Sequence, residues 1–239
     1  MLKPPTWDKI PQQQQLEYLL GGKIKLEDWY IDSTVSEKKE WTAGTFSNLR
    51  QKVRSRETYY YGDTDKWLYE AFELCPISGI NVAIMGSTEP WYETIVSEFG
   101  GKPTTIEYNS PGYNHPGFEE ISVQEYWKNP HQFDIALSIS SFEHDGLGRY
   151  GDPLNPSGDL RAMAEMKKIL KPDGILILAV PIGLDKVVWN AHRIYGPIRF
   201  PMLTQGWKLE GCVGMDDSLL STDSGNSGAY QPIVVLRNI

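Results

Sequence analysis

The residues best suited to chemistry gather in one stretch, SSFEHDGLGRYGDPLNPSGD, which runs from Ser140 to Asp159. It carries two serines, a Glu-His-Asp cluster, an arginine and two further aspartates among glycines and prolines. A histidine titrates near neutral pH, so His144 can remove a proton from an acceptor hydroxyl. Arg149 offers a planar cation for an anionic group of an acceptor. Apolar segments on both sides leave two interpretations open: a loop that carries chemistry, or a polar connection between core elements.

A second polar cluster, WNAHRIYG, begins at Trp189 and brings another histidine and another arginine. His192 is a second candidate base, and Arg193 and Tyr195 are candidate contacts for an acceptor. The competing interpretation is structural, with the cluster capping a helix or lining the edge of the core. The choice depends on the elements that position both polar clusters.

Those elements alternate between strands and helices. Strands are expected at INVAIMG (80–86), TTIEY (104–108), FDIALSIS (133–140), ILILAVP (175–181), GWKLEGCVG (206–214) and PIVVLRNI (232–239). Helices are expected at DTDKWLYEAFEL (63–74), capped by Asp63 or Thr64, at TEPWYETIVSEFGG (88–101) with Pro90 in its first turn, and at GDLRAMAEMKKIL (158–170), capped by Asp159, with KPDG (171–174) as a turn. Such alternation indicates a parallel α/β sheet, in which ligands bind at the carboxyl ends of the strands near the topological switch point. We expect residues 1–76 to form a mainly helical extension or lid, and residues 77–239 to form the α/β domain.

Composition excludes several classes of protein. A formal net charge of -8 disfavours binding to nucleic acid or to an anionic membrane, and the basic run NLRQKVRSR (48–56) is interpreted as a solvated helix face. The two cysteines lack metal-ligand spacing, which argues against a zinc site and a disulfide framework, and no other metal motif is present. No secretory signal or membrane-spanning run is visible, so a cytoplasmic protein is expected.

The segment FDIALSISSFEHDGLG, followed by LRAMAEMKKILKPDGILILAVP, resembles class I S-adenosylmethionine-dependent methyltransferases. More narrowly, SSFEHDGLGRYGDPLNPSGD and HRIYG resemble the DUF268 family, which is methyltransferase-like and has no settled reaction. The superfamily resemblance covers about residues 80–239. It implies a doubly wound, Rossmann-like sheet that is mostly parallel with an antiparallel last strand, preceded here by the N-terminal helical extension. It also implies S-adenosylmethionine as the cofactor.

The resemblance assigns roles to residues at the ends of the expected strands. Gly86 and Ser87 begin the loop beside the cofactor, Glu107 is placed to bind the ribose hydroxyls, and Ser140, Ser141 and Glu143 face the methionine part. His144 and His192 are then the candidate bases, and Asp145, Arg149, Arg193 and Tyr195 the candidate acceptor contacts. The first loop departs from the superfamily pattern, because Thr88 and Pro90 replace later glycines and Ala83 or Ile84 replaces the usual acid.

Two functions follow from these features. The first is O-methylation of a small or sugar-like acceptor, either a small molecule or a glycan, with a histidine as the base. The second is a methyltransferase-like binding or scaffold module that has lost cofactor binding, which the degenerate loop GSTEPW favours. A hydrolase is disfavoured, since no nucleophile elbow is present.

Overall fold

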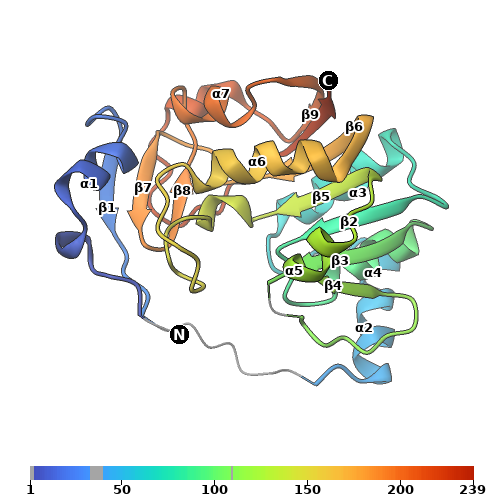
Figure 1. Ribbon diagram of the computed structural model, residues 1–239. Coiled ribbons are helices and arrows are strands. Elements are labelled where there is room, and N and C mark those ends of the chain that lie inside the picture. The colour runs from blue at the N-terminus through green and yellow to red at the C-terminus, as the bar shows by residue number, and fades with distance from the viewer. Residues whose placement is uncertain (1–2, 33–39, 109) are drawn as a thin grey trace.

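A seven-stranded sheet in the order β4-β3-β2-β5-β6-β10-β9 forms the centre of the computed structural model, which describes residues 3–32, 40–108 and 110–239 (Figure 1). The strands are β2 (Asn81–Met85), β3 (Lys102–Glu107), β4 (Glu119–Ser122), β5 (Phe133–Ile139), β6 (Leu170–Ala179), β9 (Trp207–Val213) and β10 (Ile233–Asn238). Strands β2 to β6 pair in parallel, whereas β10 is antiparallel to both β6 and β9. The predicted doubly wound sheet with an antiparallel last strand is therefore confirmed.

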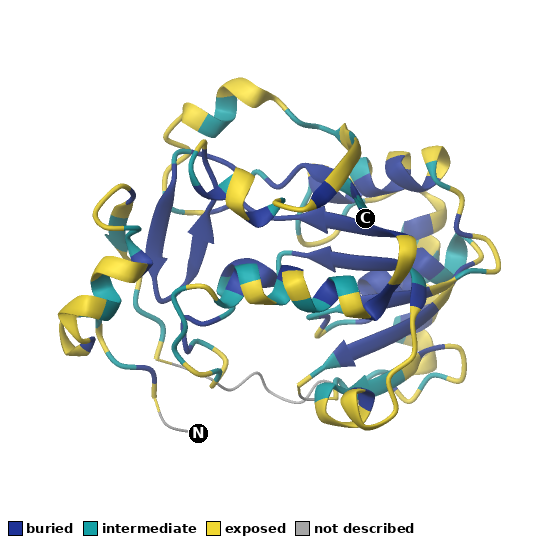
Figure 2. Ribbon diagram, turned by 45° about the horizontal axis from the view of Figure 1, so that its top comes forward, coloured by how far each residue is buried: buried dark blue, intermediate teal, exposed yellow. Residues whose placement is uncertain are grey.

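Helices cover both faces of this sheet. On one face lie α2 (Ala43–Arg54), α3 (Asp63–Leu74) and α4 (Trp91–Glu98), and on the other lie α5 (Val123–Lys128), α6 (Gly158–Ile169) and α7 (Arg199–Leu203). Strand β5 is buried over nearly its whole length, because Ile135 and Leu137 pack with α3 and α4 while Ala136 packs with α6. Figure 2 shows the same contrast, with dark strands inside and exposed outer faces on the helices. Burial on both faces explains the continuous apolar runs in the sequence.

A second, three-stranded sheet stands apart from the main one, in the order β1-β7-β8. Strand β1 (Lys25–Asp28) runs parallel to β7 (Lys186–Trp189), which pairs antiparallel with β8 (His192–Ile194). The cluster WNAHRIYG thus spans a β-hairpin, and the expected extension contributes a strand as well as helices. Two short helices precede β1, namely η1 (Trp7–Lys9) and α1 (Gln12–Tyr18). Parts of the predicted extension, residues 1–2 and 33–39, lie outside the described residues.

Local boundaries differ from expectation, and strand β4 and helix α5 were not expected. Helix α6 begins after Ser157, so Asp159 lies in its first turn and is not its cap. Helix α3 begins after Gly62, so neither expected cap holds: Asp63 is the first helical residue, and Thr64 donates its hydroxyl to the Gln231 carbonyl. Pro90 precedes α4 at the N-cap position. The expected turn 171–174 belongs to β6, because Leu170 already pairs with Phe133 ahead of a register shift in β5.

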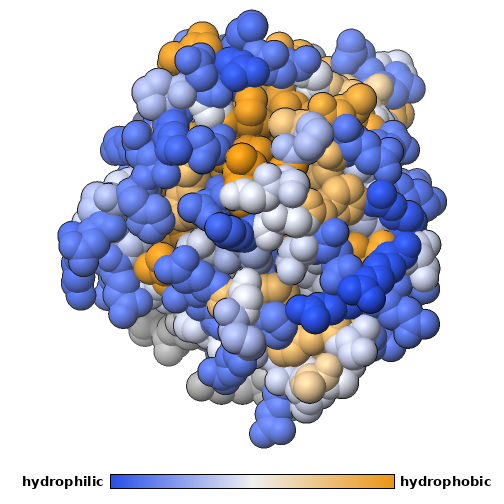
Figure 3. Space-filling model, turned by 90° about the vertical axis from the view of Figure 1, so that its right-hand side faces the viewer, coloured by the Kyte–Doolittle hydropathy of each residue, from blue (hydrophilic) through white to orange (hydrophobic). Residues whose placement is uncertain are grey.

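No helix within 3–32, 40–108 and 110–239 is both long and apolar enough to cross a bilayer. Figure 3 shows the side that faces right in Figure 1, where apolar patches lie among hydrophilic side chains. The carboxyl ends of β2, β3 and β5 point the other way, toward the second sheet (Figure 1).

Candidate functional site

The site forms where the loops after β2 and β5 meet, at the switch point of the sheet. Strand β2 lies between β3 and β5, and the chain proceeds outward from it in both directions. Gly86 has a φ of +71°, and a side chain there would collide with Ser141. The absence of a side chain at Gly86 therefore lets the loop after β2 approach Ser141 in the loop after β5.

A buried network fixes the loop after β2 from beneath. The Ser87 hydroxyl donates to Glu93 Oε2 at 3.1 Å, and the Thr105 hydroxyl donates to Glu93 Oε1 at 2.6 Å. The Tyr113 hydroxyl lies 3.3 Å from the same Oε1 atom. Burial raises the pKa of Glu93 to about 7. Ser87 was expected beside the cofactor, and its hydroxyl is hydrogen-bonded within this buried network. Sequence reasoning missed Glu93, because nothing distinguishes it from a surface glutamate in a first helical turn.

Ser140 joins the loop after β5 to the segment that leads into β10. Its backbone is left-handed, with φ +50°, a strained conformation that is uncommon outside glycine and concentrates at functional sites. Its Oγ donates to Glu143 Oε1 at 2.5 Å and accepts a hydrogen bond from Gln231 Nε2 at 3.1 Å. Glu143 is fully buried, and burial raises its pKa to about 7. The other two oxygens of this group, Glu143 Oε2 and Gln231 Oε1, are buried without a hydrogen-bond partner.

The two candidate bases lie side by side, with ring centroids 6.3 Å apart. His144 Nδ1 lies 2.6 Å from the Ala191 carbonyl, so this nitrogen carries the proton, and Nε2 lies 3.5 Å from Glu143 Oε1. His192 Nε2 is buried and has no partner. Burial lowers the pKa of His144 to about 3 and that of His192 to about 4, with the cation of Arg149 contributing in both cases. Both rings are therefore neutral at physiological pH. Of the two, His192 has a ring nitrogen, Nε2, that is free to form a hydrogen bond.

Buried arginine side chains hold the loop after β5 in place. Arg193 is fully buried and donates to the backbone carbonyls of Glu143 and Asp145, at 3.3 and 2.6 Å. Asp159 binds Arg199 through both oxygens, at 2.7 and 2.8 Å, and accepts from the Tyr195 hydroxyl at 3.0 Å. Arg193 and Tyr195 were expected to contact an acceptor, but both side chains are enclosed. The Tyr195 hydroxyl bonds Asp159, and the two terminal nitrogens of Arg193 donate to backbone carbonyls, while its Nε has no hydrogen-bond partner and lies 3.8 Å from Asp159 Oδ1. We therefore assign them to positioning the loop.

The remaining predicted residues stay near the surface of the same loop. Arg149 Nη1 donates to the Ala191 carbonyl at 3.0 Å, and its guanidinium lies 5.0 Å from the Tyr150 ring centre. Burial and the neighbouring carboxylate of Asp152 raise the pKa of Asp145 to about 8. Asp152 accepts from backbone N–H groups of the loop, as a turn residue does. Glu107 ends β3, where it was predicted, and its Oε1 accepts from the N–H of Tyr108.

Aromatic rings form a row across this edge of the sheet. Trp29, which follows β1, contacts His192 with centroids 5.9 Å apart, and His144 contacts Tyr150 with centroids 5.5 Å apart. With the contact between the two histidines, the row links three segments far apart in sequence. The outer rings are about half exposed, Trp29 at 47 % and Tyr150 at 52 %. The row thus offers exposed rings on either side of two neutral imidazoles.

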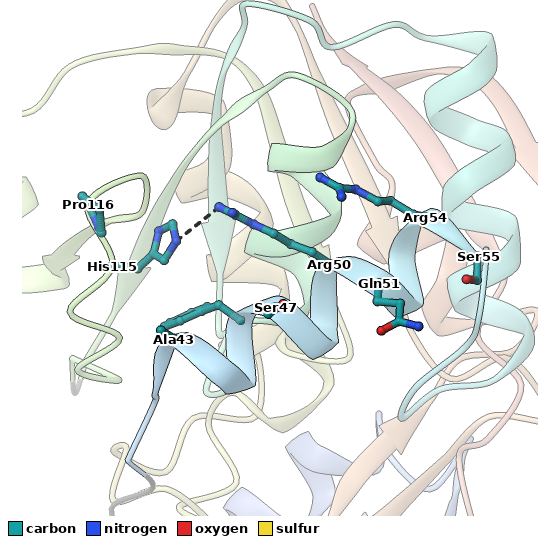
Figure 4. A pocket seen from close by; sticks show the side chains of 9 residues that line it. Ala43, Ser47, Arg50, Gln51, Arg54, Ser55, His115 and Pro116 are labelled. Carbon is teal, nitrogen blue, oxygen red and sulfur yellow. Dashed lines mark hydrogen bonds between the residues drawn. The ribbon is translucent and has the colours of Figure 1, made fainter.

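A cavity of about 700 Å³ lies elsewhere, between α2 and the loop at His115 (Figure 4). Arg50 Nη2 lies 3.3 Å from His115 Nε2, and both Arg50 and Arg54 pair with Glu98. The basic run of α2 is thereby balanced by carboxylates, as expected of a solvated helix face. Among the residues that the structure describes, no three His, Cys, Asp or Glu side chains cluster to hold a metal ion.

Comparison with known proteins gives a family and a fold. Residues 79–216 match the family model described as Caenorhabditis protein of unknown function, DUF268. No curated protein matches the chain.

Solved structures similar to this one include several methyltransferases. The 1,6-didemethyltoxoflavin-N1-methyltransferase of Burkholderia thailandensis, solved with 1,6-didemethyltoxoflavin and S-adenosylhomocysteine, has 13% identity and a TM-score of 0.54 over 87% of this chain and 92% of that one. A SAM-dependent methyltransferase from Aquifex aeolicus has 17% identity and a TM-score of 0.49, over 84% and 100%. The N-methyltransferase NodS of Bradyrhizobium japonicum WM9, with S-adenosyl-l-homocysteine, has 13% identity and a TM-score of 0.48, over 80% and 98%. At such identities the first of these structures establishes a methyltransferase fold.

Proposed function

The chain belongs to the DUF268 family, and we propose that it is an S-adenosylmethionine-dependent methyltransferase that methylates an oxygen of a small or sugar-like acceptor. One observation carries this proposal. Three buried polar atoms without partners, on Glu143, His192 and Gln231, surround the switch point of a sheet with a methyltransferase fold. Buried polar atoms are normally hydrogen-bonded, so unpaired ones at a ligand-binding edge indicate that a ligand completes them.

The residues at this edge fit the cofactor. Glu107 lies at the end of β3, where a carboxylate can accept hydrogen bonds from a ribose. Glu143 and Gln231 offer unpaired acceptor oxygens beside Ser140. The first loop is held rigidly by Glu93, although Pro90 and the contact between Gly86 and Ser141 narrow it. A narrower loop after β2 leaves less room for the cofactor, which favours the alternative, a binding module without cofactor.

His192 is the residue that we assign as the base. It is neutral, its Nε2 is unpaired, and its ring lies in the row between Trp29 and His144. When S-adenosylmethionine is bound, it supplies a methyl group whose carbon bonds to the acceptor oxygen while the carbon–sulfur bond breaks, leaving the electron pair on sulfur. His192 Nε2 takes the hydroxyl proton in that step. His144, anchored to Ala191, holds the neighbouring ring in position.

The acceptor side combines exposed rings with polar groups. Trp29 and Tyr150 are about half exposed, so their rings can contact the apolar side of a sugar, and the neutral histidines suit a hydroxyl. The chain as a whole is acidic, with a formal net charge of -8. This balance favours a neutral acceptor over a polyanionic one such as nucleic acid.

Isothermal titration calorimetry with S-adenosylmethionine and S-adenosylhomocysteine tests the cofactor. We expect both ligands to bind. If neither ligand gives a heat of binding, the proposal is wrong and the scaffold alternative is favoured. Incubation with ¹³C-methyl S-adenosylmethionine and fractionated small molecules and glycans then tests the acceptor. The carbon chemical shift of the product separates an O-methyl from an N-methyl group, and labelling on nitrogen would refute O-methylation.

A further inference from the structure

Two carboxyl groups of this chain are alike in burial and differ in their partners. Glu93 and Glu143 are both fully buried, and burial raises the pKa of each to about 7. Each oxygen of Glu93 accepts a hydrogen bond from a side-chain hydroxyl. Glu143 has a hydroxyl partner at Oε1 only, whereas Oε2 is buried and unpaired. Leaving a buried acceptor unpaired is unfavourable, so the ionised carboxylate of Glu143 lacks a donor that the carboxylate of Glu93 has.

Gln231, beside Glu143, also has a buried oxygen without a hydrogen-bond partner. Its amide nitrogen donates to Ser140 Oγ and its Oε1 has no partner. The single hydroxyl of Ser140 is therefore hydrogen-bonded to both Glu143 and Gln231, and the Ser140 backbone has a left-handed φ. Both unpaired atoms are oxygens that accept hydrogen bonds. A ligand group with several donors and a positive charge is the complement of such a pair.

The methionine portion of the cofactor carries such a group, its α-ammonium. The strand on the other side of the switch point offers no acid to bind it, since β2 ends in Ala83, Ile84 and Met85. We infer that Glu143 Oε2 and Gln231 Oε1 bind this ammonium and that the Glu143 carboxyl releases its proton when the cofactor binds. The inference rests on the proposed function, because it requires that cofactor.

The groups that surround Glu143 leave one rival source of the proton. From the loop and β8, the guanidinium groups of Arg149 and Arg193 act on the carboxyl and lower its pKa, and His144 is already neutral at neutral pH. The neighbouring tyrosines are Tyr61 ahead of α3, Tyr150 in the loop and Tyr195 after β8. The pKa of each tyrosine lies above its ordinary value, so none loses a proton near pH 7. Asp145 is the rival, since its pKa of about 8 also keeps it protonated.

Calorimetry in buffers of different ionisation enthalpy counts the protons released on binding. With a pKa of about 7, Glu143 is expected to release about 0.9 proton at pH 6 and about 0.1 at pH 8, and the affinity for S-adenosylhomocysteine rises about tenfold over that range. S-adenosylhomocysteine has the ammonium but no sulfonium, so it should release as much as S-adenosylmethionine. 5′-Methylthioadenosine lacks the ammonium and should release none.

Variants separate Glu143 from its neighbours. We expect Glu143→Gln to abolish proton release on S-adenosylhomocysteine binding and to weaken that binding about tenfold at pH 8. The matched buried variant Glu93→Gln and the rival variant Asp145→Asn should both keep the release. Undiminished release in Glu143→Gln, or loss of release in Asp145→Asn alone, overturns the inference.

Two further outcomes are decisive without the variants. Should Glu143→Gln fail to fold, the comparison of S-adenosylhomocysteine with 5′-methylthioadenosine on the unaltered chain decides, and equal release by both ligands overturns the inference. Binding without any proton release overturns it while the proposed function stands. No binding of either S-adenosyl ligand overturns both.

Discussion

At the scale of the residue, hydrogen bonding separates side chains that look equivalent in the sequence. His144 and His192 are both neutral, yet His144 is tied to Ala191 whereas His192 Nε2 is unpaired. Arg193 and Arg149 are both near the site, yet Arg193 is enclosed among carbonyls and Arg149 is partly exposed. Of the two histidines, His192 is therefore the candidate base, and of the two arginines, Arg149 is the one that an acceptor can reach.

His192→Phe should lower the rate of methyl transfer by about 10²- to 10⁴-fold, because the ring keeps its contacts but takes no proton. The binding of S-adenosylhomocysteine should be unchanged. Release of labelled S-adenosylhomocysteine in the presence of an active acceptor fraction measures the rate. Full activity in His192→Phe would show that another group takes the proton.

Glu93 makes a distinct contribution to stability as a function of pH. Its pKa is raised from 4.5 to about 7 in the folded chain, so the contribution is fully present below pH 4.5 and is lost as the pH rises through 7. Between these values the unfolded chain binds fewer protons, so the free energy of unfolding falls by up to about 1.4 kcal/mol per pH unit from this group.

Glu93→Gln should remove that fall, which urea denaturation at pH 5, 6 and 7 can measure. The exposed Glu70 provides the control, and Glu70→Gln should leave the pH dependence unchanged. A slope in Glu93→Gln equal to that of the unaltered chain contradicts the assignment.

At the scale of the element, the main sheet was accessible from the sequence and the second sheet was not. The runs near Ile80, Ile135 and Ile175 predict β2, β5 and β6 because strands buried on both faces must be apolar throughout. Strand β1, with the sequence KLED, is short and charged, and only its pairing with β7 defines it. Tertiary pairing of this kind leaves no local signal.

The candidate site also has one part that the sequence predicts and one part that it does not. The positions of Ser140, Glu143 and Glu107 follow from strand ends, which the sequence locates. The cap expected at Asp159 was wrong because the carboxylate is taken by Arg199, a partner 40 residues away. Gln231 was missed, since it lies ahead of β10 in a segment without a motif. Contacts between distant segments decide these roles.

The pair of Asp159 and Arg199 joins the first turn of α6 to the first residue of α7. Asp159→Ala leaves two buried cations, Arg193 and Arg199, without their carboxylate, and we expect a loss of about 3–5 kcal/mol in the free energy of unfolding. The exposed pair of Asp134 and Lys171 is the control, where Asp134→Ala should lose less than about 1 kcal/mol. Urea denaturation compares the two, and equal losses would contradict the buried role.

At the scale of the whole molecule, the candidate site lies between two sheets. The loop from Ser140 is held from the main sheet by Gln231 and from the second sheet by Arg193. It is also held from α1, where the Tyr18 hydroxyl donates to the Gly146 carbonyl at 2.5 Å. The edges of the main sheet are unsuited to pairing with another chain, because β4 is short and β9 carries a register shift and the ion pairs of Glu210 with Lys208 and Arg237.

Hydrogen exchange should report this arrangement when the cofactor binds. S-adenosylhomocysteine should slow exchange in residues 86–91, 140–150 and 228–232, which surround the switch point. Residues 43–54 of α2, several of which line the separate cavity, should be unaffected. Protection confined to α2 would place the ligand in that cavity and contradict the site described.

The parallel pairing of β1 with β7 also has a consequence for biosynthesis. About 160 residues separate Asp28 from Lys186, so β1 leaves the ribosome long before its partner exists. At a typical 5–20 residues per second the delay is about 8–32 s. Trp29, which follows β1, reaches its place beside His192 only when the hairpin has been made. The aromatic row is thus among the last parts of the molecule to assemble, after the sheet strands β2 to β6 are already available to pair.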